Sequence, residues 1–249
     1  MEDEDGMQKL FYELSSESRL SILRELQANT IKMQPLARKL DMTDTEAFRQ
    51  LQRLSDAQLI QKNTNGVYSI TQYGRLIMRL SNSFNFAYNH RELLLTRDIL
   101  RLPEEFIDRI GELSGAEVST NMFVIINGLE KIIERADEYV WAIAEKPIES
   151  VTETMHSHIA KGIKFRIMYS ESLISLYPLV PGEQGIVERR TITDIPVTMI
   201  VTEKEAGLTF ISMDKRSDYA AFRGTDTAFM RWVSDLFLHY WKLGKPVVP

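Results

Sequence analysis

One short predicted helix carries polar side chains whose types suit the recognition of nucleic acid bases. It lies within residues 36–54, LARKLDMTDTEAFRQLQRL. At about 100° per residue, its apolar arc and its outer arc separate cleanly. The arc expected to be buried holds Ala47, Leu51, Leu54 and Gln58. The outer arc holds Thr45, Arg49 and Gln52, with Arg53 at its edge. Because arginine pairs with guanine and glutamine with adenine in the major groove, this pattern favours a DNA-recognition helix.

The residues before this helix indicate how it is positioned. Thr43 and Glu46 have the spacing of a capping box, in which each side chain satisfies a free backbone N–H of the other residue. A helix should therefore begin there, with Thr43 also near the DNA. Pro35 fits the first turn of a short preceding helix, and a leucine rhythm over residues 10–26 predicts a first helix that breaks near residue 15.

A hairpin is predicted directly after the recognition helix. Residues 59–70, LIQKNTNGVYSI, place Asn65-Gly66 between two short strands, as in a type I′ turn. Lys62, Asn63 and Asn65 would then reach neighbouring phosphates. Three helices followed by a hairpin predict a winged helix-turn-helix that binds double-stranded DNA. Amphipathic helices generally have polar outer faces, so a protein-docking adaptor without catalytic activity is the alternative.

The net charge of the whole chain does not decide whether it binds DNA, because the charge differs between segments. The 249-residue chain has a net charge of −5, but residues 34–80 contain seven basic and four acidic side chains. Cysteine is absent, which excludes disulfides, thiolate nucleophiles and cysteine-bound zinc. The sequence has no long apolar run and no recognisable leader, so we expect a cytoplasmic protein with no membrane partner.

The middle of the chain predicts a long linking helix over residues 72–102, ended by Pro103 and capped by Thr71. Intermittent apolar positions run along it: Ile77, Leu80, Phe84, Tyr88, Leu94 and Leu95. They would pack within the chain or form a homodimer, which is how helix-turn-helix proteins commonly read two half-sites. We divide the chain into a DNA-binding domain (1–80), a helical linker or dimerisation segment (81–117) and an effector domain (118–249).

Short apolar runs alternate with amphipathic helices in the last part of the chain, which predicts an α/β domain with a largely parallel sheet. Strands are expected at residues 122–127, 138–145, 164–170, 186–192, 197–203, 207–213 and 219–222. Helices are expected at 128–136 and 150–160, a loop at 178–186, and a turn at Ala206-Gly207. Thr225 would cap a closing helix whose apolar stripe packs in the core.

Two sets of sequence segments resemble known regulators. SRLSILREL, LARKLDMTDTEAFRQLQRLSDAQLI and GVYSITQYGRLI resemble archaeal winged-helix regulators of the ArsR-like and TrmB-like kind. The segment from VTMIVTEKEAGLTF to DLFLHYW is similar to the effector domain of methanogenesis-regulatory proteins from methanogenic archaea. Together these resemblances imply an archaeal transcription regulator. They also imply that its second domain is distantly similar to the phospholipase D fold and senses a small molecule.

That implied fold makes a phosphodiesterase the enzymatic alternative. Phospholipase D chemistry needs His-x-Lys, whereas this chain has HIAK, from His158 to Lys161, which is one residue too long and lies in a predicted helix. Glu153 and His156 are one helical turn apart, but no second cluster of metal ligands accompanies them. We therefore expect no enzyme activity, no metal and no cofactor.

A sensor domain needs a pocket, and arginines near aromatic residues are the candidates for binding a small anionic effector. The candidates lie on or beside predicted strands: Trp141, Arg166, Arg189, Arg190, Tyr219 and Arg223. Solvent-facing arginines on strands are the alternative interpretation for each of them.

Overall fold

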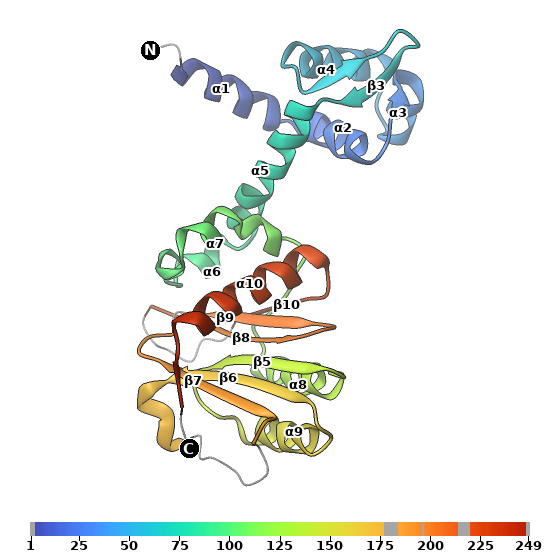
Figure 1. Ribbon diagram of the computed structural model, residues 1–249. Coiled ribbons are helices and arrows are strands. Elements are labelled where there is room, and N and C mark those ends of the chain that lie inside the picture. The colour runs from blue at the N-terminus through green and yellow to red at the C-terminus, as the bar shows by residue number, and fades with distance from the viewer. Residues whose placement is uncertain (1–2, 177–183, 196, 214–219, 248–249) are drawn as a thin grey trace. The chain divides into compact units, whose positions relative to one another are not determined.

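The computed structural model describes residues 3–176, 184–195, 197–213 and 220–247. Two compact units result, Met1–Asn82 and Ser83–Pro249. The elements of the first unit follow in chain order: α1 (Asp3–Leu14), α2 (Glu17–Ala28), β1 (Ile31–Lys32), α3 (Met33–Lys39), α4 (Asp44–Asp56), β2 (Ile60–Lys62), β3 (Val67–Ile70) and the start of α5 (Gln72–Asn89). The expected order of helices followed by a hairpin is confirmed (Figure 1).

Hydroxyl side chains begin three of these helices. Ser16 Oγ accepts the Arg19 N–H, Thr43 Oγ1 accepts the Glu46 N–H, and Thr71 Oγ1 accepts the Gly74 N–H. The predicted caps at Thr43 and Thr71 are therefore confirmed. Only half of the expected capping box forms, because the Glu46 carboxylate accepts the hydroxyl of Ser18 at 3.2 Å instead of reaching back to residue 43.

The hairpin differs from the predicted type I′ turn. Gly66 has a φ of +77°, whereas Asn65 is not among the described residues with positive φ, and a type I′ turn requires two such residues. Instead, Asn63 Oδ1 accepts the N–H groups of Asn65 and Val67, and the Gly66 N–H bonds to Asn63 O. The turn is therefore longer than expected and is held by the Asn63 side chain.

The first unit encloses its own apolar core. Ile22, Leu23, Leu36, Leu51 and Leu54 are fully buried within it. Gln58 was expected on the buried arc of the recognition helix, but this prediction is wrong. Helix α4 ends at Asp56, and Gln58 follows it as an exposed residue with a φ of +58°.

The second unit begins within α5 and continues through short helical pieces into one sheet. Its elements are α6 (Arg91–Leu94), η1 (Ile99–Arg101), α7 (Glu104–Asp108), η2 (Ile110–Leu113), β4 (Glu117–Ser119), α8 (Met122–Glu134), β5 (Tyr139–Ala144), α9 (Glu149–Ile159), β6 (Lys164–Ser170), η3 (Glu171–Leu176), β7 (Val187–Ile192), β8 (Val197–Thr202), β9 (Ala206–Phe210), β10 (Ala221–Gly224), α10 (Thr227–Leu243) and β11 (Lys245–Pro246). The single helix expected to reach residue 102 is thus broken after Asn89. Much of the segment expected as a linker packs in this unit, with Phe86, Leu102 and Phe106 buried.

The sheet has the strand order β11-β7-β6-β5-β8-β9-β10-β4. Among its described strands, only β5–β6 and β6–β7 pair in parallel, and the other neighbours are antiparallel. The expectation of a largely parallel sheet is therefore wrong. The Ala206-Gly207 turn is also wrong, because both residues lie in β9, paired with Val201 and Ile200.

Two helix boundaries differ from the sequence-based expectations. Residues 122–127 were predicted as a strand but form the first turns of α8, which Asn121 caps by accepting the N–H groups of Phe123 and Val124. Asp226, rather than Thr225, caps α10. The predicted loop at 178–186 lies largely outside the described residues.

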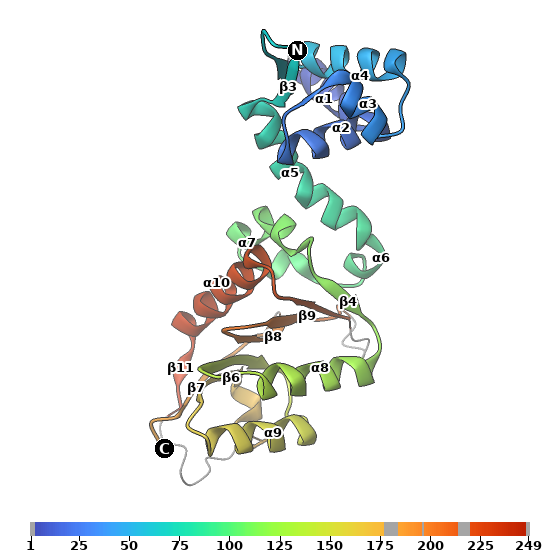
Figure 2. The same cartoon turned by 90° about the vertical axis from the view of Figure 1, so that its right-hand side faces the viewer.

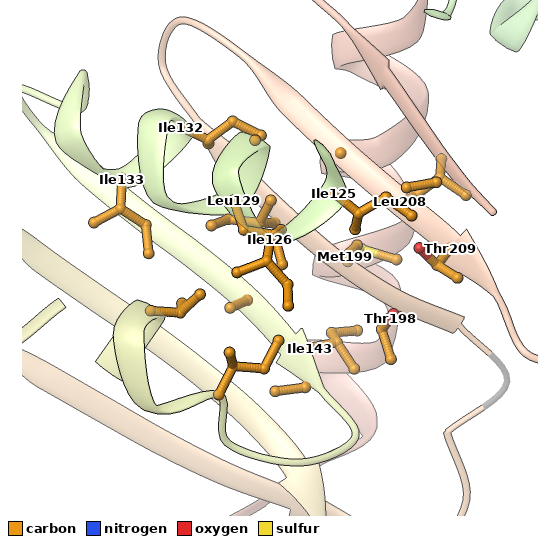
Figure 3. A pocket seen from close by; sticks show the side chains of 18 of the residues that line it. Ile125, Ile126, Leu129, Ile132, Ile133, Ile143, Thr198, Met199, Leu208 and Thr209 are labelled. Atoms are coloured by element: carbon orange, nitrogen blue, oxygen red, sulfur yellow. The ribbon is translucent and has the colours of Figure 1, made fainter. Parts of the chain in front are cut away.

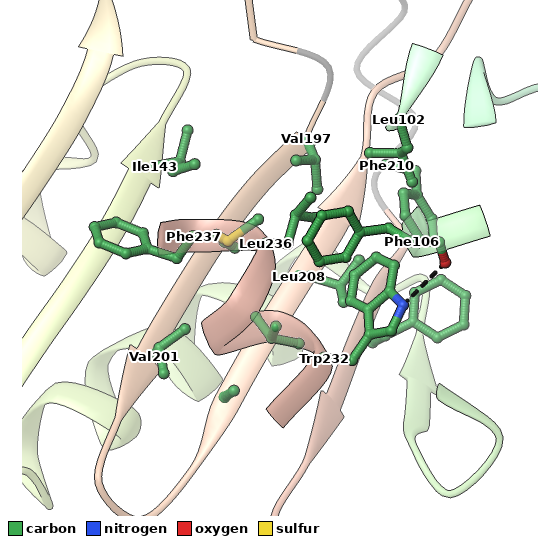
Figure 4. Close-up of a cluster of buried hydrophobic side chains, with 14 of the residues drawn as sticks. Leu102, Phe106, Ile143, Val197, Val201, Leu208, Phe210, Trp232, Leu236 and Phe237 are labelled. Atoms are coloured by element: carbon green, nitrogen blue, oxygen red, sulfur yellow. Dashed lines mark hydrogen bonds between the residues drawn. The ribbon is translucent and has the colours of Figure 1, made fainter. Parts of the chain in front are cut away.

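The two faces of the sheet are covered differently. Helix α10 lies on one face, and α8 and α9 lie on the other (Figures 1 and 2). The α10 face is rich in aromatic side chains, with Phe229, Trp232 and Phe237 fully buried. Trp232 Nε1 donates to Phe106 O at 3.1 Å, which ties α10 to α7 (Figure 4). The predicted core role of α10 is confirmed.

Candidate nucleic-acid and ligand-binding sites

Helix α4 exposes the polar face that the sequence indicated. Thr45, Arg49 and Gln52 are exposed, while Ala47 and Leu51 are fully buried. Within the described residues, Arg49 makes no hydrogen bond or ion pair with its side chain. The side-chain amide of Gln52 donates to Asp56 at 2.8 Å, one turn along the helix. This face therefore presents one cation and two hydrogen-bonding side chains to solvent.

Sequence reasoning missed Phe48, which lies on the same face with 56% of its surface exposed. The helical period offered the signal, since position 48 is three residues after Thr45 and four before Gln52. An exposed aromatic ring beside an arginine is suited to contact a thymine methyl group.

Arg53 does not lie free at the edge of this face. Its guanidinium donates two hydrogen bonds to the Glu13 carboxylate, one of them at 3.1 Å from Nε, and sits 4.9 Å from the ring centre of Tyr12. The hydrogen bonds from Arg53 lower the pKa of Glu13 below its ordinary value and raise the pKa of Arg53. The structure thus gives Arg53 a role in holding α1 to α4.

Arg19 reinforces this junction from the buried side. It donates to the backbone carbonyls of Tyr12 and Glu13, each at 2.7 Å, and to Gln50 Oε1 at 3.1 Å. The C-terminal end of α1 is thereby fixed to α2 and α4.

The remaining DNA-binding candidates are all exposed, but they differ in whether their side chains hold the local backbone. Lys62 is exposed, with its ammonium 5.4 Å from the ring centre of Tyr68, and Asn65 is exposed in the turn. Asn63 and Thr43 use their side chains to hold the turn and the helix start. Lys62 and Asn65 are therefore the better placed of the predicted phosphate contacts.

The described residues among the predicted effector candidates fall into two separate groups rather than one site. Arg166 lies between Trp141 and Trp241, 5.6 Å from each ring centre, and its Nε is 3.3 Å from Glu188. Arg190 donates to Trp241 O at 2.7 Å. Tyr219 lies outside the described residues.

Arg189 and Arg223 lie elsewhere, along a cavity on the α8 and α9 side of the sheet. Arg223 donates to the buried carboxylate of Glu205, and this hydrogen bond raises the pKa of Arg223. Arg135 approaches the same carboxylate at 3.6 Å. Glu205 thus already balances the charge of Arg223.

The cavity has a volume of about 650 Å³ (Figure 3), within the usual range for small-molecule sites. The side of the cavity opposite the sheet is lined by apolar side chains of α8 and α9, including Ile125, Ile126, Leu129, Val151 and Met155. The sequence predicts a pocket but not this aliphatic lining, because the lining depends on which residues of distant strands face the helices.

Small residues on one face of the strands make this space. Ala142 and Ala144 of β5, Gly207 of β9 and Ala221 of β10 line the cavity. They alternate along their strands with Ile143, Leu208 and Phe222, which pack in the α10 core. The small residues thus leave room beside α8 and α9, and Ile143, Leu208 and Phe222 also contribute to the lining of the cavity.

His158 and His156 lie in different surroundings. His158 is buried, and its ring nitrogens lie 3.0 Å from Thr154 O and 3.3 Å from Glu134 O. His156 lies at the cavity wall. Within the described parts of the chain, no group of three potential ligands is placed to hold a metal ion, and no helix is long and apolar enough to span a membrane.

Comparison with known proteins matches part of the chain to a family. Residues 8–90 match the model described as the HVO_A0261 N-terminal domain, which is less than half of the chain. No curated protein matches significantly.

Solved structures give weak likenesses. TrmBL2, described as an archaeal chromatin protein with a novel mode of DNA binding, is 11% identical, with 93% of this chain and 94% of that chain covered and a TM-score of 0.44. NucT from Helicobacter pylori is 14% identical, covering 53% and 98%, with a TM-score of 0.43. Phosphatidylserine synthase from Haemophilus influenzae Rd KW20 is 9% identical, covering 53% and 38%, with a TM-score of 0.38. All three scores are below 0.5, so these likenesses establish neither fold nor function.

Proposed function

We propose that this protein is a sequence-specific DNA-binding transcription regulator whose first unit is a winged helix-turn-helix. The observation that carries this proposal is the outer face of α4, where Thr45, Phe48, Arg49 and Gln52 are exposed while the opposite side of the helix is buried. A recognition helix needs this division, because it packs on its domain with one side and enters the major groove with the other.

The surroundings of α4 support the same role. Helix α3 and the turn at Asp41, with a φ of +53°, precede α4, and the hairpin β2–β3 follows it. Lys62 and Asn65 on the hairpin are exposed and suited to contact phosphates. In this arrangement base contacts come from α4 and backbone contacts from the hairpin.

Binding to DNA is tested with the purified protein and a duplex from upstream of its own gene, against a scrambled duplex of the same composition. We expect tighter binding to the native duplex. The logarithm of the binding constant should fall linearly with the logarithm of salt concentration, by about 0.9 per phosphate neutralised. Equal binding to both duplexes, or none at low salt by folded protein, would favour the adaptor alternative.

We further propose that the protein forms a homodimer through α5. Exposed apolar side chains recur along this helix at spacings of three and four residues, which places them on one helical face. They are Tyr73, Leu76, Leu80, Phe84 and Tyr88, each between 44% and 67% exposed. A second copy of the same helix is suited to cover such a stripe, and two copies would read two half-sites.

Replacing Leu80 by Glu tests the dimer. Sedimentation should show dimeric wild type and a monomeric Leu80→Glu variant, because a charge in an apolar interface is strongly unfavourable. Asn85→Glu is the matched control, since Asn85 is exposed on another side of α5, and it should remain dimeric. A monomeric wild type, or a Leu80→Glu variant that stays dimeric, would contradict the proposal.

The second unit, in this proposal, is a non-catalytic effector domain. The buried position of His158 and its contacts with two backbone carbonyls support this assignment over a phosphodiesterase. The phosphodiesterase alternative predicts turnover of a chromogenic phosphodiester that is lost on replacing His158, whereas the effector-domain proposal predicts no turnover.

A further inference from the structure

The side chains that line the cavity between α8, α9 and the sheet limit the class of ligand that it can bind. Most of its wall is aliphatic, contributed by isoleucine, leucine, valine, methionine and alanine side chains (Figure 3). Such a wall offers no stack of aromatic rings for a planar base and few hydrogen-bonding groups for a sugar. It is suited to an aliphatic chain, whose burial is favourable by about 25 cal/mol per Å² of apolar surface.

Hydroxyl groups occupy one end of the cavity floor. In the sheet register Thr198 of β8 lies opposite Thr209 of β9, which lies opposite Ala221 of β10, which lies opposite Ser119 of β4. All four residues line the cavity. Within the described part of the chain, neither threonine hydroxyl has a hydrogen-bond partner. The hydroxyl groups of Thr198 and Thr209 are therefore available as donors to a ligand, and the small side chain of Ala221 leaves space beside them.

Basic charge lies at the same end. The antiparallel pairing of Ile143 with Met199 puts Ala144, the last residue of β5, beside Thr198. Two residues later comes Lys146, which lines the cavity, is exposed, and takes part in no ion pair within the described residues. Glu145 and Glu117 also line the cavity, so this end carries both acidic and basic side chains. The threonine hydroxyls and the Lys146 ammonium group are suited to donate hydrogen bonds to an oxygen atom of a ligand.

We propose that this cavity binds an aliphatic chain with a single oxygen-bearing end, a carboxylate or a hydroxyl, with the chain under α8 and α9 and the oxygen at Thr198 and Thr209. This assignment rests on the proposed function, since the cavity would be its effector site. This ligand differs from the small anionic effector that the sequence predicts to be bound by arginines. Arg166 and Arg190 face Trp241, and Glu205 neutralises Arg223.

Isothermal titration of the full chain with dodecanoate, dodecan-1-ol and dodecyltrimethylammonium tests the ligand class, with the two charged compounds below their micellar concentrations and the alcohol below its solubility limit. We expect dodecanoate or dodecan-1-ol to bind once per chain. The quaternary ammonium compound, which has the same tail but no hydrogen-bonding end, should bind at least tenfold more weakly. Preference for dodecanoate identifies a carboxylate ligand and preference for dodecan-1-ol a hydroxyl ligand. Binding of neither, or equal binding of all three, would overturn the proposal.

Variants locate the site. Ala142→Phe places a ring in the cavity and should lower affinity at least tenfold. Ala160→Phe, the same change at an exposed residue outside the lining, should leave affinity unchanged. Thr198→Val keeps the volume and removes one hydroxyl, so it should weaken the oxygen-bearing ligands and leave the ammonium compound unaffected. Unaltered binding by a folded Ala142→Phe or Thr198→Val protein would place the ligand elsewhere and contradict the assignment.

The DNA titration distinguishes a failure of this assignment from a failure of the proposed function. Ligand-free protein that discriminates between the native and scrambled duplexes but binds no aliphatic probe would overturn the ligand assignment alone. Protein that binds dodecanoate at this cavity but ignores DNA would overturn the regulator and leave the ligand site standing.

Discussion

Replacing Arg49 by Ala is expected to weaken binding to the native duplex by roughly ten- to a hundredfold, or about 1–3 kcal/mol, and to reduce discrimination against the scrambled duplex. Arg49 is exposed on the outer face of α4 and has no side-chain ion pair within the described residues. Its loss should therefore cost DNA contacts without disturbing the fold. Fluorescence anisotropy on both duplexes, with thermal unfolding of the same samples, measures the two quantities.

Two other arginines serve as controls for Arg49. Arg24 is exposed on α2, so Arg24→Ala removes the same charge away from the proposed interface and should leave discrimination unchanged. Arg53→Ala should lower the stability of the first unit, because Glu13 loses the two hydrogen bonds that Arg53 donates. If Arg24→Ala matched Arg49→Ala in both affinity and discrimination, α4 would not be the recognition helix.

Replacing Trp232 by Ala is expected to destabilise the second unit by about 3–5 kcal/mol, the usual cost of truncating a large buried aromatic side chain. Trp232 is 0% exposed, contacts Phe106 edge-to-face at 5.5 Å between ring centres, and donates to Phe106 O. The substitution removes this packing and leaves the carbonyl without its donor. Urea unfolding of the full chain, followed by a probe of the second unit, measures the change.

Leu243→Ala provides the reference for Trp232→Ala within the same helix. Leu243 is the last residue of α10 and is 62% exposed, so its replacement should change stability by less than about 0.5 kcal/mol. A loss below 1 kcal/mol for Trp232→Ala would show that the α7–α10 junction does not carry the stability of this unit.

Local signals in the sequence predicted much of the first unit. The caps at Thr43 and Thr71, the polar face of α4 and the hairpin all follow from residues within a few positions of one another. The error at residues 122–127 is also local. A six-residue apolar run is compatible with a strand or a buried helix, and the decisive signal was the cap at Asn121.

Non-local pairing accounts for the remaining differences. Arg53 meets Glu13 from 40 positions away, and Arg166 meets Trp241 from the last helix. Whether two strands pair in parallel or antiparallel depends on which strands are neighbours in the sheet. The periodicity of the sequence carries no information about this order. The cavity likewise requires Ala142, Gly207 and Ala221 to face the same side, a fact that emerges only once the register of the sheet is known.

The difference between the two faces of the sheet also links the stability of the second unit to the binding of a ligand. On the α8 and α9 side, aliphatic side chains border open volume and lack the contacts that a filled core would give them. A molecule that completes this part of the core adds stability in proportion to the logarithm of its concentration, about 2.7 kcal/mol at a hundred times its dissociation constant. The melting temperature of the second unit would then act as a gauge of ligand concentration.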